Sequence, residues 1–290
     1  MTSPSVTSIN LTLPGSLPLP DGGTSTIAGT LDLPGVAASM SPEEFRDAGI
    51  PVALAAHCFT CTRATPGIFR ISRALARSGI ACLRLDFPGL GDSGPDNGGV
   101  PFEDTTFSSN VDDLVGVADW LGTRLTAPSL LVGHSLGGAA VLRAAPRIPS
   151  IRAVATVAAP YLPGRAAANL LGGFADATSD DDLRTVHLAG RDIQFRRRFL
   201  TDLAERSAEP AVVNDIASLG RRGVPLLVLH SPTDLTVPVG DAEAIFAAAS
   251  WPKSLMSLPD ADHLLTRRGS AQRAGEMVST WAGWAGIRVV

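Results

Sequence analysis

The nine residues from Leu130 to Gly138, LLVGHSLGG, constrain the fold of this chain more than any other stretch. They begin with a short apolar run, which predicts a buried strand, and the small residues 139–145 after them predict a helix. A Gly-x-Ser-x-Gly sequence between a strand and a helix is typical of a strained turn that exposes its serine above a sheet. Glycine suits the two outer positions because a Cβ there would collide with neighbouring backbone. We therefore interpret Ser135 as a candidate nucleophile, and not as a chance serine in a glycine-rich turn.

Hydrophobic patterning places that turn in a mostly parallel sheet. Two alternating segments, 8–13 and 26–33, predict an antiparallel strand pair at the N-terminal edge of the sheet. From Pro51 onward, apolar strands alternate with amphipathic helices, which is typical of parallel strands joined by right-handed crossovers. The fold class is therefore α/β, with helices on both faces of the sheet. The further strands that we expect are 52–56, 81–87, 130–134, 154–158, 225–230 and 254–258, and the helices are 67–78, 108–125, 139–145, 242–247 and one around 277–281.

The length and composition predict one domain. A chain of 290 residues, 45% hydrophobic and 18% charged, can bury a single large core, so we expect one domain over 1–290. Residues 161–223 interrupt the alternation of strands and helices and are rich in Gly, Asp and Arg. Because of its length, we favour a small cap that shapes substrate access over an ordinary long connection. Within it we expect a hairpin of 185–188 and 193–195, with its turn at 190–191.

Charge and composition argue against several classes of function. The formal net charge of −4 provides no basic field for nucleic acid. Residues 1–20 lack the features of a secretory signal, and no apolar stretch approaches the ~20 residues of a membrane helix. Three cysteines, an odd number, argue against a disulfide framework and fit a reducing compartment. We therefore expect a cytoplasmic protein with no nucleic-acid partner and no membrane partner.

Cys58 and Cys61 form a C-x-x-C motif, which is also typical of a thioredoxin-like redox pair. We disfavour that interpretation because the motif follows the strand 52–56, where a serine nucleophile needs a loop for its oxyanion. A zinc site would need a second pair of ligands, and none occurs at suitable spacing. The sequence thus predicts no metal, no organic cofactor, and no dependence of activity on added thiol.

The partners that a serine nucleophile needs follow other expected strands. In open α/β sheets, ligand sites lie beyond the C-terminal ends of the strands. Ser135, Asp234 and His263 each follow a strand directly, and their order is that of the α/β-hydrolase arrangement. His263 would accept the proton of the serine, and Asp234 would orient the imidazole and stabilise its charged form. These three residues are our predicted catalytic triad.

Other histidines and acids are weaker candidates. We expect His230, at a strand end, and His187, in the insert, to be structural or surface residues. Asp262 adjoins His263 in the chain, which leaves it poorly placed to orient the imidazole ring.

Backbone N–H groups are the expected donors of the oxyanion hole, because fixed dipoles stabilise developing negative charge without reorganising. Leu136, the residue after the nucleophile, is one expected donor, and Phe59, in the loop after the strand 52–56, is the other. We also assign His134 and Cys58, the residues before Ser135 and Phe59, to the substrate-binding set.

Six segments together resemble a known family. They are AHCFTC at 56–61, LDF with GLG at 85–91, FSSNV at 107–111, GHSLGGAAVL at 133–142, HSPTD at 230–234 and ADHLL at 261–265. This combination resembles the hydrolase part of bifunctional α/β-hydrolase/OsmC proteins, over about 52–284. The resemblance implies the triad Ser135, Asp234 and His263. The sequence departs from that family in two ways. The OsmC part is missing, because the chain ends at Val290, and Thr62-Arg63 stands where that family usually has Ser-Lys. We therefore expect a free-standing hydrolase.

These features predict a serine esterase that cleaves small carboxylic esters through an acyl-enzyme on Ser135. An acyltransferase with the same triad and a non-catalytic binding module are the alternatives, and the presence of all three triad members in order argues against the second. The insert is charged at 180–182 and 196–198, and its apolar stretch 166–171 is short. We therefore expect a preference for short acyl chains, of about two to six carbons.

Overall fold

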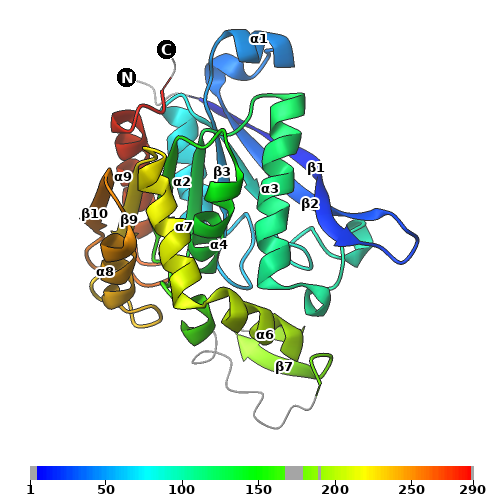
Figure 1. Cartoon of the computed structure of the whole chain (residues 1–290). Coiled ribbons are helices and arrows are strands. Elements are labelled where there is room, and N and C mark those ends of the chain that lie inside the picture. The colour runs from blue at the N-terminus through cyan, green and yellow to red at the C-terminus, as the bar shows by residue number, and fades with distance from the viewer. Residues whose placement is uncertain (1–4, 167–178, 189–190, 289–290) are drawn as a thin grey trace.

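The computed structural model describes residues 5–166, 179–188 and 191–288 (Figure 1). The strands are β1 (Val6–Pro18), β2 (Thr24–Pro34), β3 (Val52–Ala56), β4 (Ala81–Leu85), β5 (Leu130–His134), β6 (Ala153–Val157), β7 (Leu183–Leu188), β8 (Arg191–Arg196), β9 (Leu226–His230) and β10 (Lys253–Ser257). The helices are α1 (Pro42–Asp47), α2 (Pro66–Arg77), α3 (Phe107–Arg124), α4 (Leu136–Ala144), α6 (Arg197–Arg206), α7 (Glu209–Arg221), α8 (Val239–Ala248) and α9 (Ser270–Trp284). Short 3-10 turns are η1 (Gly35–Ala37), η2 (Pro95–Asn97), η3 (Phe102–Asp104) and η4 (Ala145–Arg147).

The central sheet has the order β1-β2-β4-β3-β5-β6-β9-β10 within the described ranges. β1 pairs antiparallel with β2, and β2 with β4, whereas the remaining neighbours are parallel. The register sets Gly133 of β5 beside Ala56 of β3 on one side and Thr156 of β6 on the other. The predicted antiparallel edge and parallel centre are therefore confirmed, and β5 ends in the middle of the sheet.

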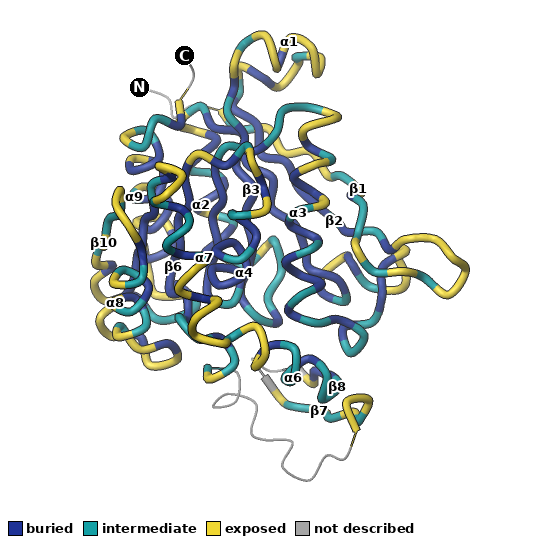
Figure 2. The backbone as a smooth tube through the Cα atoms, viewed as in Figure 1, coloured by how far each residue is buried: buried dark blue, intermediate teal, exposed yellow. Residues whose placement is uncertain are grey.

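Helices cover both faces of this sheet (Figure 1). α2 and α9 pack together on one face, while α3, α4, α7 and α8 lie on the other. Helical spacing explains the packing of α2, because Ile68, Ile71 and Leu75 fall on one stripe and are fully buried. Figure 2 shows that the central strands are buried throughout, as expected when both faces are covered. Within the described ranges, no helix is both long and apolar enough to cross a bilayer.

The insert contains more regular structure than its sequence predicts. The expected hairpin is present as β7 paired with β8, although part of its turn falls outside the described ranges. α6 follows the hairpin, and both lie at the end of the sheet where the parallel strands terminate (Figure 1). α7, which we did not predict, packs against α4 and α8 on the sheet face and does not extend the cap. Most of the apolar stretch 166–171 lies outside the described residues.

Asp113, on α3, is a buried carboxyl group with an incomplete set of partners. It is 1% exposed, and its Oδ1 accepts a hydrogen bond from the backbone N–H of Ser16 at 2.7 Å. Its Oδ2 has no partner among the described residues. Burial raises the pKa of this carboxyl to about 7, although the bond from Ser16 partly offsets the rise. An ionised Asp113 therefore opposes folding.

Asp113→Asn should raise the free energy of unfolding at pH 8 by an amount on the order of 1 kcal/mol or more. Between the ordinary pKa of 3.8 and about 7, the folded protein holds a proton that the unfolded chain has released. Wild-type stability therefore falls as the pH rises through this window, and the cost is complete above it. Urea unfolding at pH 5 and pH 8 should show that the gain from the asparagine shrinks at the lower pH.

Asp112→Asn is the matched control for this prediction. Asp112 is the neighbouring carboxylate, with a side chain that is 47% exposed and paired with Arg147 on the surface. Exposed pairs contribute little to stability, so this variant should behave like the wild type at both pH values. A gain from Asp113→Asn that is equal at pH 5 and pH 8 would contradict the assignment.

Candidate active site

Ser135 lies on a sharp turn between β5 and α4. Its φ of 54° and ψ of −123° belong to a strained region of backbone conformation for a residue with a side chain. Its N–H donates to the carbonyl of Val157 at 2.8 Å, which holds the turn against β6. A Cβ at Gly133 would lie 2.2 Å from the carbonyl oxygen of Gly137, and one at Gly137 would lie 2.4 Å from that of His57. Both glycines are therefore required for the turn to close.

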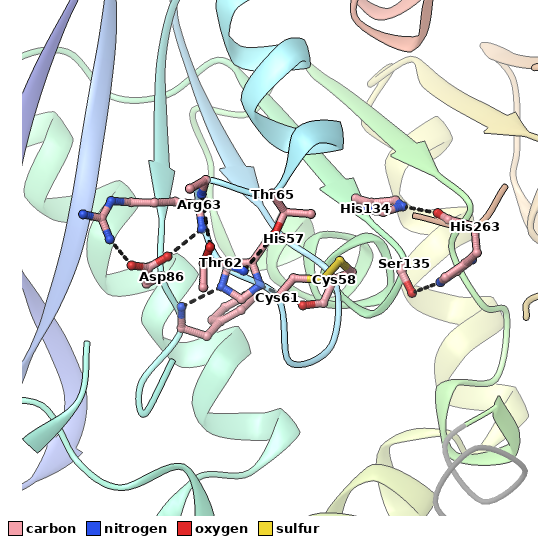
Figure 3. Close-up of a disulfide and its surroundings, with 12 residues drawn as sticks. His57, Cys58, Cys61, Thr62, Arg63, Thr65, Asp86, His134, Ser135 and His263 are labelled. Atoms are coloured by element: carbon pink, nitrogen blue, oxygen red, sulfur yellow. Dashed lines mark hydrogen bonds and ion pairs between the residues drawn. A yellow bond between two sulfur atoms is a disulfide. The ribbon is translucent and has the colours of Figure 1, made fainter. Parts of the chain in front are cut away.

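A chain of hydrogen bonds joins Ser135 to two residues that follow β9 and β10. The Ser135 Oγ lies 2.8 Å from Nε2 of His263 (Figure 3). Nδ1 of His263 lies 2.8 Å from Oδ2 of Asp234. An ionised carboxylate only accepts, so Nδ1 of the imidazole donates to Asp234. In the neutral ring, Nε2 is then left to accept the serine proton. The structure thus brings together the three residues of the predicted triad.

Asp234 is held in place as a buried acceptor. Its side chain is fully buried, and its Oδ1 accepts from the backbone N–H groups of Thr236 at 2.8 Å and Val237 at 3.0 Å. Burial on its own raises the pKa of the carboxyl, but the bond from His263 and those two backbone donors outweigh it, and the net pKa lies below the usual value. The group is therefore ionised at neutral pH and directed at the imidazole.

The rival candidates have other partners. Asp262 accepts from the Thr266 hydroxyl at 2.7 Å and from the backbone N–H of Arg267 at 2.8 Å, so it stabilises the turn after His263. The buried Nε2 of His230 donates to the carbonyl of Val237 at 2.9 Å. His187 is exposed on β7, next to Asp192. None of these four contacts involves Ser135.

His134 lies beneath the loop of the candidate base. The ring is fully buried, and its Nε2 donates to the backbone carbonyl of His263 at 2.8 Å (Figure 3). Burial, the largest cause, lowers its pKa to about 4. We predicted a contact with substrate at this residue. The structure instead shows a buried ring that positions the backbone of His263, because β5 directs its last side chain away from the serine.

His57 connects the loops after β3 and β4. A backbone N–H can only donate, so the bond of 3.0 Å from Phe87 makes Nε2 of His57 an acceptor. Nδ1 then carries the proton and donates to the carbonyl of Cys58 at 2.8 Å. Burial lowers the pKa of this ring to about 4, so it stays neutral at ordinary pH. The sequence alone did not reveal this function, although a histidine at the end of a buried strand is a signal for it.

Cys58 and Cys61 form a disulfide, with their Cα atoms 5.2 Å apart (Figure 3). The odd cysteine count argued against a disulfide framework, and it did not predict this local pair beside the free, buried Cys82. Cys58 is 2% exposed and lines the same small cavity as Phe59 and Leu136, so its predicted contact with substrate stays a prediction. Among the described residues, no group of three His, Cys, Asp or Glu side chains is arranged to hold a metal.

The two predicted oxyanion donors border one small space. Leu136 is the first residue of α4, where backbone N–H groups lack partners within the helix and the helix dipole is positive. Leu136 and Phe59 both line a cavity of about 10 Å³ next to the first turn of α4. The Phe59 ring is packed by Phe102 of η3 and Phe199 of α6, at centroid distances of 5.8 and 5.5 Å. The insert, through Phe199, thus contacts the loop that contains Phe59.

Known proteins share this architecture. The esterase domain of a Rhodothermus marinus protein is 35% identical over 95% of this chain and 98% of its own, with a TM-score of 0.69. Est1E from Butyrivibrio proteoclasticus, solved with ferulic acid bound, is 20% identical over 91% of this chain and 96% of its own, with a TM-score of 0.72. Dienelactone hydrolase from Anabaena variabilis, 18% identical over 98% of this chain and 99% of its own, has a TM-score of 0.58. The last two likenesses show the fold alone.

No curated protein matches the chain. The likeness to α/β-hydrolase/OsmC proteins stays a prediction, because none of the three structures bears on it. The model of the α/β-hydrolase family matches residues 53–274, which include the turn at Ser135 and both of its hydrogen-bonded partners. The chain therefore belongs to the α/β-hydrolase family.

Proposed function

We propose that this protein is a serine hydrolase that cleaves small carboxylic esters through an acyl-enzyme formed on Ser135. The observation that supports this most strongly is the continuous hydrogen-bond chain from the Ser135 Oγ through His263 to Asp234, with both links at 2.8 Å. A serine hydroxyl alone is a weak nucleophile and requires such a base. The esterase domain that is 35% identical over nearly the whole chain is consistent with this reaction class.

In the acylation step, the Ser135 Oγ attacks the ester carbonyl while Nε2 of His263 takes its proton. The carbonyl oxygen becomes an oxyanion, to which we assign the backbone N–H groups of Leu136 and Phe59 as donors. His263 then returns the proton to the departing alkoxide, and an alcohol leaves. Throughout, the Asp234 carboxylate stabilises the positive charge on the ring.

In the deacylation step, water replaces the alcohol. His263 accepts a proton from the water molecule as its oxygen attacks the acyl carbon, and the same donors stabilise the second oxyanion. Collapse of this intermediate breaks the bond to Ser135, which recovers its proton from the ring. The net reaction consumes one water molecule and yields one acid and one alcohol.

The described part of the cap favours small substrates. Its arginines bind acidic residues: Arg196 and Arg198 contact Asp104 of η3 at 3.2 and 2.7 Å. Its large apolar side chains Phe195 and Phe199 point inward and are fully buried. A lipase lid instead offers a broad apolar face to an interface, so we assign short acyl chains to this protein.

Aryl esters that differ only in acyl length should show the highest kcat/KM at about two to six carbons, with a steep decline for longer chains. The physical reason is that an acyl chain longer than the site can hold finds no further apolar contacts and clashes with the residues that enclose the site. A series of p-nitrophenyl esters from acetyl to palmitoyl measures this, and added butanol shows by product analysis whether an alcohol competes with water. Efficient turnover of an emulsified long-chain triglyceride, with interfacial activation, would overturn the assignment.

A further inference from the structure

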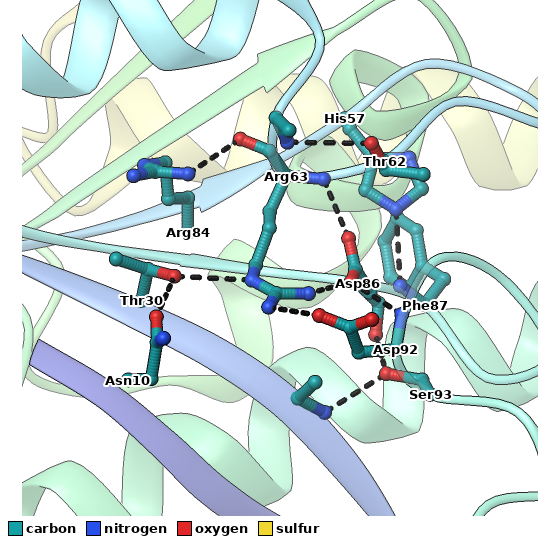
Figure 4. Close-up of polar contacts among 12 residues, drawn as sticks. Asn10, Thr30, His57, Thr62, Arg63, Arg84, Asp86, Phe87, Asp92 and Ser93 are labelled. Atoms are coloured by element: carbon teal, nitrogen blue, oxygen red, sulfur yellow. Dashed lines mark hydrogen bonds and ion pairs between the residues drawn. The ribbon is translucent and has the colours of Figure 1, made fainter. Parts of the chain in front are cut away.

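The loop after β3 is anchored firmly at both ends. On the near side, His57 bonds to Phe87 through Nε2 and to Cys58 through Nδ1. On the far side, the Arg63 N–H donates to Oδ1 of the fully buried Asp86 at 2.6 Å, and Arg84 donates to the Arg63 carbonyl at 2.7 Å (Figure 4).

The Arg63 side chain adds to this far anchor. Its guanidinium group contacts Asp86, Asp92 and the Thr30 hydroxyl (Figure 4). The several fixed donors of an arginine reach all three groups at once, which the single ammonium of a lysine does not. The five residues between the anchors, 58–62, are therefore fixed at their two ends.

The turn between the anchors is strained. The N–H of Cys61 donates to the carbonyl of Cys58 at 3.1 Å, which closes a tight turn around Phe59 and Thr60. Thr60 has a φ of 55°, a left-handed conformation that a β-branched residue rarely adopts and that turns ordinarily give to glycine. Such a conformation persists when its surroundings impose it. The Cys58–Cys61 disulfide spans this turn covalently.

We propose that the Cys58–Cys61 disulfide positions the Phe59 N–H for the oxyanion, so that its reduction by a thiol slows acyl transfer at Ser135. The proposal rests on the function proposed above and adds a redox control to the same site. It replaces our expectation from the sequence that activity does not depend on added thiol. With the bond intact, Thr60 is kept in its strained conformation and Phe59 stays beside Leu136. With the bond broken, the turn is free to relax between its anchors, and the donor moves.

Reduction of the Cys58–Cys61 disulfide consumes two molecules of a small thiol. A small thiolate attacks the sulfur of Cys61, which is half-buried, whereas Cys58 is 2% exposed. The Cys58–Cys61 bond breaks, Cys58 leaves as a thiolate and takes a proton, and a mixed disulfide remains on Cys61. A second thiolate attacks the outer sulfur of that mixed disulfide, which releases the small disulfide and the Cys61 thiolate.

The geometry of the loop also allows the disulfide to form again after reduction. Because His57 and Arg63 stay anchored, the two Cα atoms remain near the 5.2 Å of the oxidised form, within the range that a disulfide requires. Oxidised glutathione, a disulfide, should therefore restore the bond and release two molecules of glutathione. A reversible change of this kind distinguishes positioning from simple unfolding.

Reduction of the full-length protein should lower kcat for p-nitrophenyl butyrate about 10- to 100-fold and leave KM nearly unchanged. An oxyanion donor acts mainly in the transition state, so its displacement affects kcat. The redox state is verified by thiol titration of the denatured protein, with one thiol expected when oxidised and three when reduced, since the chain has three cysteines.

Two variants complete the experiment. Cys58→Ala/Cys61→Ala should have the low kcat under all conditions and should not respond to thiol. Cys82→Ala removes the free buried cysteine of β4, and it should keep the wild-type kcat and the wild-type response. Circular dichroism of each sample shows that the fold is retained.

The outcomes separate this proposal from the proposed function. A drop in kcat on reduction that oxidised glutathione reverses, and that is absent from the double variant, supports it. If the oxidised protein, with one titrated thiol, and the reduced protein, with three, have equal kcat, the redox proposal is overturned and the proposed esterase function is not. An oxidised protein that hydrolyses no ester overturns both.

Discussion

Ser135→Ala should reduce ester hydrolysis by a factor on the order of 10⁶, to nearly the rate without enzyme. The alanine removes the Oγ that attacks the carbonyl, so no acyl-enzyme forms, and His263 has no hydroxyl to deprotonate. The fold should persist, because the turn depends on the backbone bond of residue 135 to Val157 and on the glycines around it, all of which the variant keeps. Release of p-nitrophenol from the butyrate ester measures the loss.

Ser129→Ala provides the matched control. Ser129 lies just before the other end of β5, and its hydroxyl is 3.5 Å from the carbonyl of Val52, far along the strand from the candidate site. Its removal should leave kcat unchanged. Full activity in Ser135→Ala, by contrast, would show that the hydrogen-bonded chain is not the catalytic centre and that ester hydrolysis takes place elsewhere.

Asp234→Asn should cost up to about 10⁴-fold in kcat with the fold retained. The amide oxygen can still accept from the backbone N–H groups of Thr236 and Val237, which preserves the turn. Its amide nitrogen then faces Nδ1 of His263 and donates where the carboxylate accepted. The imidazole is forced into the tautomer in which Nε2 carries the proton and cannot take one from Ser135.

Asp262→Asn tests the choice of acid. Asp262 is as close in sequence to His263 as a residue can be, yet its oxygens accept from Thr266 and from the N–H of Arg267. The variant should therefore lose much less activity than Asp234→Asn when the two are measured side by side. An inactive Asp262→Asn beside an active Asp234→Asn would show that the wrong acid has been named.

The sequence was sufficient to predict the central sheet and to predict that its strand ends bring the triad residues together. Buried parallel strands are short continuous apolar runs, so β3, β5 and β9 stand out against their polar flanks. Once the strands are placed, their C-terminal ends fall together, and any polar residue that follows a strand is brought to that edge. This is why Ser135 and its two partners could be named before their distances were known.

The helices after the insert's hairpin were harder to foresee. α6 begins with two arginines, and its buried face consists of Phe199 and Leu203 alone, which is too little periodicity to detect. α6 owes its stability to tertiary packing, and such contacts are invisible in a local pattern. α7, by contrast, buries Val212, Ile216 and Leu219 at the i, i+4, i+7 spacing of a helix, a signal in the sequence that we missed.

The disulfide and the buried histidines required three-dimensional information. In sequence, a C-x-x-C pair is equally compatible with a dithiol, a metal-binding pair and a disulfide. Only the turn geometry of Cys58 and Cys61 shows that the pair forms a disulfide. The function of His134 depends on a carbonyl that is distant in the chain, that of His263. No spacing rule connects the two positions, because the separation is set by the intervening sheet.

The central claim is that Ser135 is the nucleophile, and covalent labelling tests it most directly. The oxidised wild-type protein is treated with a fluorophosphonate, which traps an activated serine, and the labelled peptide is identified by mass spectrometry. We predict one phosphonyl group per chain, located on Ser135, with loss of ester hydrolysis in proportion to labelling and no labelling of Ser135→Ala. A protein that hydrolyses esters but acquires its label on another residue, or acquires none, would contradict the claim.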